Sequence, residues 1–239
     1  MPTHHAVSSG HAGHRSVSGG LARASVFGVS DGLVSNVSLI LGFAGSGVDN
    51  TVVRLAGVAG AVAGAISMAA GEWVSVTSQN DLIRRELDVE RRELENNADL
   101  ETEELAAMYE QHGIEPERAA AAAADVMRDA EIALAVHARE ELGVAPDELP
   151  SAVAAAALSF VCFVLGAVLP LIPFYVTSGS TAAFAALAIG VVAAAAVGGI
   201  VARFAERPLW FGVARQVAIV LVACGVTYAI GELAGVTLN

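Results

Sequence analysis

Charged residues are scarce in this sequence of 239 residues, because Asp, Glu, Lys and Arg together make up only 16% of it. Hydrophobic residues make up 55%, and the mean hydropathy is +0.60. So little charge excludes an ordinary soluble domain. We therefore predict an all-α integral membrane protein with several spans, whose partners include the lipid bilayer.

Cysteine is also rare. Cys162 and Cys224 are the two cysteines, and they lie far apart inside apolar stretches without CxxC spacing. This pattern indicates small packing residues and argues against a disulfide or a thiolate metal site.

The first residues lack the long apolar run of a signal peptide. We interpret 1–23 as a disordered tail in which Ser and Gly alternate with four histidines, namely His4, His5, His11 and His14. A histidine cluster in a flexible tail can have weak metal affinity without being a defined site.

Five apolar stretches approach the length of about 20 residues that a bilayer core requires. Two fall within 24–78 and three within 150–239, at Val26–Ala44, Leu55–Val76, Val153–Val176, Ala182–Phe204 and Val213–Ala234. Five spans place the termini on opposite sides of the membrane. Arginines flank the first span and the turn between the fourth and fifth, so we expect a cytoplasmic N-terminus, although Arg54 in the first outer loop counts against it.

Between the second and third spans lies an acidic block, 79–149. It holds 20 of the 25 Asp and Glu residues and 7 of the 13 basic ones. The same topology makes this block a cytoplasmic helical domain. On a helical wheel, Glu86, Glu90 and Glu93 fall on its apolar side, away from the arginines. Inward, unpaired carboxylates need a cation or a proton, so we predict a divalent metal site.

Two further groups of ligands follow in the acidic block. Asp99 is a candidate N-cap, and Glu101 and Glu104 in the next turn either bind metal or simply complement the helix dipole. A helix that starts at Pro116 and stops near Gly143 carries His137 and Glu141 on one face. Three helices then offer a mostly oxygen ligand set, which suits Mn²⁺ or Fe²⁺.

Polar residues inside the spans are functional candidates by default. If the first two spans form a hairpin that turns near Asp49, Asp31 and Met68 lie at equal depth, with Ser35 and Asn36 one turn further along. Glu72 either joins this route or anchors the membrane edge. Pro170 and Pro173 break the third span, either beside a pathway or as a simple kink.

Three segments resemble the vacuolar iron transporter family, which includes bacterial and nodulin-like members: Ser30–Leu33, Ala63–Met68 and Pro170–Pro173. The resemblance covers residues 25–236. It implies five spans, a homodimer, a cytoplasmic metal-binding domain, and proton-coupled export of Fe²⁺ or Mn²⁺ from the cytosol. For a bacterial member it implies the plasma membrane.

The resemblance assigns the soluble ligands to Glu90, Glu93, Glu101, Glu104 and Glu141, and the intramembrane pair to Asp31 and Met68. Two positions depart from the pattern. This chain has His137 and Ala138 where plant members carry paired methionines, and Gly60 where they carry a carboxylate in span two. Glu72 lies about 18 Å along the helix from Gly60 and so cannot take the same place.

Three functions compete at this point. The first is the transporter, which binds its cargo transiently, holds no permanent cofactor, has no nucleic-acid partner and is not an enzyme. The second is a membrane-anchored metal buffer or sensor without transport. The third, a di-iron oxidase, would need paired Glu-x-x-His motifs, and the sequence contains none.

Overall fold

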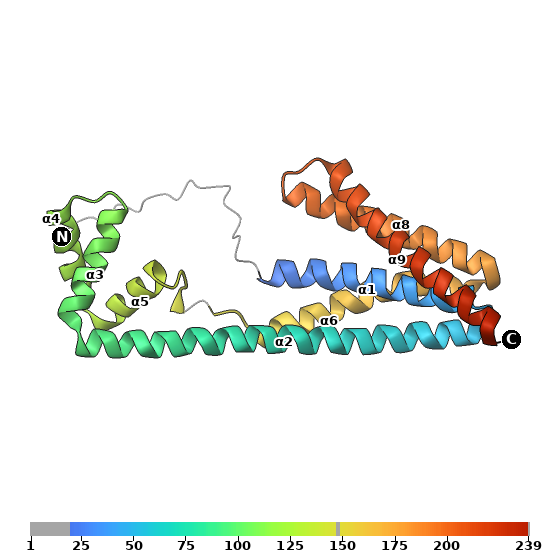
Figure 1. Ribbon diagram of the computed structural model, residues 1–239, viewed down its shortest axis with the longest axis horizontal. Helices are drawn as coiled ribbons and strands as arrows, with labels where there is room; N and C mark the ends of the chain where they lie inside the picture. Colours follow the sequence, from blue (N-terminus) through green and yellow to red (C-terminus); the bar gives the residue numbers. More distant parts are fainter. Residues whose placement is uncertain (1–19, 147–148, 239) are drawn as a thin grey trace, which may run out of the picture. The chain divides into compact units, whose positions relative to one another are not determined.

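The computed structural model describes residues 20–146 and 149–238, and within these ranges every regular element is a helix (Figure 1). The predicted tail falls mostly on 1–19, outside the described residues, and the first helix begins at Gly20. In chain order the elements are α1 (Gly20–Gly45), α2 (Asn50–Asn96), α3 (Ala98–Gln111), α4 (Pro116–Val126), α5 (Ala130–Glu140), α6 (Ala152–Val168), the 3₁₀ turn η2 (Leu169–Leu171), α7 (Pro173–Val176), α8 (Gly179–Phe204) and α9 (Leu209–Leu238).

Five of the described helices are long and apolar enough to cross a membrane. They are Leu21–Gly45, the apolar part of Asn50–Asn96, Ala152–Leu171, Gly179–Phe204 and Leu209–Gly235. The prediction of an all-helical membrane protein is confirmed in the described residues, and five of its helices are candidate spans.

The chain divides into two compact units. One comprises the chain up to Ala65 and from Val161 onward, and the other comprises Ile66–Phe160. The second is wider than the predicted acidic block because α2 and α6 run through its boundaries. We describe each unit by itself.

In the membrane unit, α1 packs along α8 and α9, and its core includes the fully buried Leu33, Val37 and Val220. Glycine lets α1 and α6 approach closely. A Cβ atom added at Gly32 would lie 2.1 Å from the carbonyl oxygen of Phe163, and one at Gly166 would lie 2.2 Å from that of Val29. No side chain fits between two backbones at that distance, so glycine is required at both positions.

The third span breaks where its prolines predicted. The α-helix ends at Val168, a 3₁₀ turn follows, and α7 then starts at Pro173. Asn50 at the start of α2 donates a hydrogen bond to the Phe174 carbonyl at 2.9 Å, which holds the far side of the break. The segment is therefore an interrupted helix rather than a simple kink.

Both cysteines are buried free thiols, as the packing interpretation expects. The sulfur of Cys224 lies 3.8 Å from the hydroxyl of Ser38. This contact joins α9 to α1 inside the membrane unit.

The second unit places the polar end of α2 beside three short helices. Leu87 of α2 packs against Leu134 and Ala138 of α5, while Leu105 of α3 packs against Ala123 of α4. These two small apolar clusters fix the faces of α2, α3 and α5 that carry the acidic side chains.

Two local predictions in this unit were wrong. The single helix expected from Pro116 to Gly143 is two helices, because Asp129 accepts hydrogen bonds from the backbone N–H groups of Glu131 and Ile132 and so starts a new helix. Asp99 is not an N-cap. It lies inside the first turn of α3, whose N-cap position is Asn97.

Candidate metal centre

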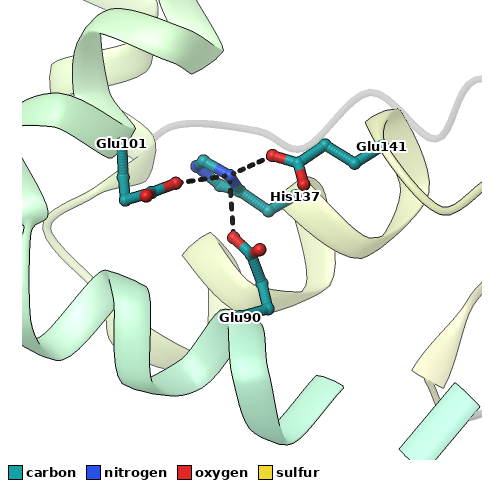
Figure 2. A group of neighbouring side chains, drawn as sticks. All are labelled: Glu90, Glu101, His137 and Glu141. Atoms are coloured by element: carbon teal, nitrogen blue, oxygen red, sulfur yellow. Dashed lines mark hydrogen bonds and ion pairs between the residues drawn. The ribbon is translucent and has the colours of Figure 1, made fainter. Parts of the chain in front are cut away.

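Four predicted ligands meet in the second unit. Glu90 comes from α2, Glu101 from the first turn of α3, His137 from the last turn of α5 and Glu141 from its C-cap. One ligand atom from each of the four lies within 4.8 Å of all the others. Figure 2 shows the three carboxylates pointing toward the imidazole ring.

The distances suit a single metal ion. His137 Nδ1 lies 3.0 Å from Glu90 Oε1, 3.2 Å from Glu141 Oε1 and 3.7 Å from Glu101 Oε2. An ion with ligands at about 2.1 Å brings neighbouring ligand atoms to about 3 to 4 Å from each other. The four side chains therefore have the spacing of a coordination shell.

Burial makes this group costly without a cation. His137 is fully buried, and Glu90 and Glu101 are 6% and 5% exposed, whereas Glu141 opens to solvent. Among the described residues, Glu90 Oε1 has the ion-pair contact with His137 Nδ1 but no hydrogen bond, and the other ring nitrogen, His137 Nε2, has no hydrogen-bond partner. Buried polar atoms without partners are uncommon in native proteins and are expected where an ion or a water belongs.

The electrostatics agree with the burial. The pKa of Glu90 is raised to about 7, mainly by burial; the charges of Glu141, Glu101 and Glu93 contribute to the increase, and His137 opposes it. Burial also raises the pKa of Glu101, with Glu104 as the next cause. The carboxylates repel one another, so a divalent cation would stabilise their charged forms.

Glu93 and Glu104, the other two predicted ligands of the soluble block, lie outside this group. Both side chains are exposed, although their charges act on Glu90 and Glu101. Their role as ligands stays a prediction.

The expectation that Glu86 is inward and free of arginine was wrong. Glu86 is half-buried, and its Oε1 lies 3.0 Å from Nη1 of the neighbouring Arg85. The wheel gives the direction of a side chain but not how far the neighbouring helices extend. In this unit, the neighbouring helices cover α2 at Glu90, whereas the Glu86 carboxylate contacts the side chain of Arg85.

One contact between α3 and α5 was not predicted. His112 Nδ1 lies 3.6 Å from Glu140 Oε2, beside the site but outside it. His112 follows the last residue of α3 and has no helical partner at i,i+4, so the sequence carried no signal for this pair.

The predicted pathway residues lie in both units. Asp31 is exposed on α1 in the membrane unit, and the hydroxyl of Ser35 donates to its backbone carbonyl. Met68 and Glu72 are half-buried on α2 and belong to the other unit. The predicted level pairing of Asp31 with Met68 stays a prediction.

Comparison with known sequences decides the family. The sequence profile described as the VIT family matches residues 22–232, which include all four clustered side chains and most of the five apolar helices. The chain belongs to the VIT family. As a member, it is similar to several proteins named as iron transporters.

A vacuolar iron transporter of Acanthamoeba castellanii is 40% identical over 161 residues, which cover 66% of this chain and 58% of that protein. Vacuolar iron transporter 1 of Oryza sativa is 31% identical over 205 residues, which cover 85% of this chain and 81% of the rice protein. A vacuolar iron transporter homolog of Arabidopsis thaliana is 44% identical over 102 residues, or 43% of this chain and 44% of that protein. The matched part is thus less than two thirds of the amoebal protein and most of the rice protein.

Proposed function

We propose that this protein transports Fe²⁺ or Mn²⁺ across a membrane and that the group Glu90, Glu101, His137 and Glu141 captures the ion. The observation that carries the proposal is the buried convergence of three carboxylates and one imidazole with unsatisfied polar atoms. Membership of a family whose relatives are named vacuolar iron transporters supports it.

The donor set favours particular ions. Carboxylate oxygens suit Mn²⁺ and other hard ions, while imidazole suits Fe²⁺, and thiolates, which select softer metals, are absent from the group. Three oxygen donors and one nitrogen donor leave room for water on a six-coordinate ion. The ion is cargo rather than a permanent cofactor.

Protons would drive the cycle. A carboxylate holds either a proton or a cation, and Glu90, with a pKa of about 7, exchanges one for the other near neutral pH. In the membrane, Asp31 would carry the same exchange, with Met68 as a soft ligand on the proposed route and Glu72 as the alternative proton site. Metal leaves the cytosol as protons enter.

The topology and assembly belong to the same proposal. Arg203, Arg207 and Arg215 flank the turn between α8 and α9, which favours a cytoplasmic placement for that turn, the N-terminus and the acidic unit. Asp31 is exposed on the membrane unit, and a carboxylate facing lipid is costly. A second copy of the chain would cover it, so we propose a homodimer in the bacterial plasma membrane.

A second candidate function is a membrane-anchored metal buffer or sensor. The four ligands all lie within the second unit, so ion binding there does not by itself require transport. Measuring metal flux across a membrane distinguishes this function from transport.

The test is metal flux in proteoliposomes with Fe²⁺, Mn²⁺, Zn²⁺ and Ca²⁺, each with and without an imposed pH gradient. The proposal predicts saturable Fe²⁺ or Mn²⁺ flux that the gradient accelerates, and little Ca²⁺ flux. Tight Mn²⁺ binding without flux under any gradient would support the buffer instead.

A further inference from the structure

A side-chain amide lies buried in the middle of the first membrane span. Asn36 of α1 is 2% exposed and is close to the midpoint of the apolar stretch 26–44. A polar group at this depth has no water to bind, and leaving it without a hydrogen bond destabilises the protein. Each of its polar atoms therefore needs a partner.

The side-chain nitrogen of Asn36 has a hydrogen-bond partner. Asn36 Nδ2 donates to the backbone carbonyl of Ala167, 2.6 Å away, at the end of α6. In a 3₁₀ turn that carbonyl would receive its hydrogen bond from residue 170, which is a proline without an N–H. Because a carbonyl only accepts, the contact fixes the amide with its nitrogen toward α6 and its oxygen away from it.

The side-chain oxygen of Asn36 differs from the nitrogen. Asn36 Oδ1 is buried and lacks a hydrogen-bond partner in the part of the chain that the structure describes. It faces α2 at Gly60, where an added Cβ atom would lie 3.1 Å from the oxygen and 2.4 Å from Cδ2 of Leu39. The oxygen therefore meets a bare stretch of backbone, with one half-buried, flexible side chain beside it.

We infer that Asn36 Oδ1 is a neutral oxygen ligand for the transported divalent cation, which it contacts between α1 and α2 at Gly60. The inference rests on the proposed transport function and deepens it. An amide oxygen binds the same hard cations as a carboxylate but carries no charge and takes up no proton. It can therefore ligate a passing ion without holding it, once the Leu39 side chain turns aside.

The position agrees with how transporters build their sites. Binding sites near the bilayer midplane commonly lie beside interrupted helices, and neighbouring groups satisfy the backbone carbonyls that an interruption frees. Here the interruption is the one after Val168, and Asn36 itself holds the freed carbonyl. The same residue thus stabilises the break and presents an oxygen beside it.

Two glycine variants give a matched test. Gly60→Ala places a methyl group against Asn36 Oδ1 and leaves the asparagine intact. Gly57→Ala, one turn earlier on the same helix, adds a methyl against Leu171 Cδ1 at 2.5 Å and Ile40 Cγ2 at 2.8 Å, where the nearest atoms are all apolar. Both changes crowd a flexible side chain, and only the first covers the oxygen.

The measurement is Mn²⁺ flux in proteoliposomes, normalised to folded protein, with the melting temperature of each variant recorded. If Gly60→Ala removes a ligand of the charged ion, its flux should be at most about one tenth of the flux through Gly57→Ala. A flux ratio near one between the two variants would overturn the inference.

Asn36→Leu distinguishes two roles of Asn36, as a ligand of the ion and as the residue that holds the Ala167 carbonyl. The ligand role predicts background flux per folded molecule, whatever happens to the melting temperature. A lower melting temperature with normal flux per folded molecule would leave Asn36 as a clamp on Ala167 and reject the ligand. If the wild-type protein shows no flux, the proposed function fails; if it shows flux and the glycine variants are equal, only this inference fails.

Discussion

The acidic unit and the membrane unit hold their buried polar groups in opposite ways. In the acidic unit, three carboxylates and an imidazole converge, and their charges oppose one another. In the membrane unit, single neutral amides are fixed to backbone carbonyls, as the buried Asn36 is to Ala167 and the half-buried Asn50 is to Phe174. A charged cluster binds an ion strongly, whereas isolated neutral oxygens bind it weakly enough to release it.

Under the proposed function, this difference would let one chain both collect and conduct an ion. Conduction requires that binding be favourable enough for entry and weak enough for exit. Strong capture in water and weak contact in the membrane satisfy both requirements, provided that one intramembrane group exchanges metal for protons. Asp31 is our candidate for that exchange.

The largest expected effect is that of Asp31→Asn. The amide keeps the size and polarity of the carboxylate but cannot alternate between a proton and a cation, so flux should fall to background at every pH. Mn²⁺ binding by the full-length variant in detergent should stay normal, because the four capture ligands are intact. Wild-type flux through the purified variant would move the coupling group to Glu72.

The next effect separates buried from exposed acids. Glu90→Gln removes a buried ligand charge, and we expect Mn²⁺ affinity to fall about tenfold or more, measured by calorimetry on the full-length protein. Asp88→Asn removes an exposed charge two residues away, whose Oδ1 lies 3.5 Å from Nη1 of Arg91, and serves as the control, with a loss of less than about threefold. Equal losses would show that long-range charge, rather than ligation, governs binding.

A third prediction concerns pH. The pKa of Glu90 is raised from 4.5 to about 7 in the folded state, so the folded protein holds a proton that the unfolded chain has lost between these values. The metal-free protein should therefore lose stability as pH rises from about 5 to 7. Mn²⁺ affinity should rise over the same window, because the metal must displace that proton.

Thermal unfolding with and without Mn²⁺ across this pH range checks the sign of the effect. The glutamine in Glu90→Gln cannot titrate. In this variant the dependence of stability on pH should therefore be weaker, both with and without Mn²⁺. A wild-type protein whose metal-free stability increases between pH 5 and 7 would contradict the burial of an uncompensated carboxyl group.

Local spacing explains why much of the site could be predicted. His137 and Glu141 are four residues apart on one helix, so their convergence needs no knowledge of the tertiary fold. Glu90 could be identified by its apolar neighbours on the wheel. The wheel could not distinguish it from Glu86 and Glu93, because depth depends on where α3 and α5 lie against α2.

Long-range contacts explain what the sequence could not show. The sequence placed Asn36 near the proposed route because Asn36 is close to Asp31 in the chain. The hydrogen-bond partner of Asn36, Ala167, is 131 residues away and could not be predicted. The break between α4 and α5 was hidden by the alanine-rich run, which favours helix throughout. Only the cap at Asp129 marks the break.

The smallest expected effect is a change of ion preference in His137→Met. Exchanging imidazole for a thioether makes the ligand set softer, so affinity should shift from Mn²⁺ toward softer ions by roughly tenfold in relative terms. Competition binding with Mn²⁺, Fe²⁺ and Zn²⁺ measures the ranking. An unchanged ranking would return His137 to the role of a packed core histidine.

The most direct test of proton-coupled metal transport measures Mn²⁺ and proton movement at once, in proteoliposomes that contain wild-type protein and dyes for both ions. If the protein exchanges metal for protons, Mn²⁺ will cross the membrane while protons move in the opposite direction, and both movements will vanish in Asp31→Asn while Mn²⁺ binding remains. Mn²⁺ that binds to the wild-type protein without crossing, or that crosses without proton movement, would contradict this exchange.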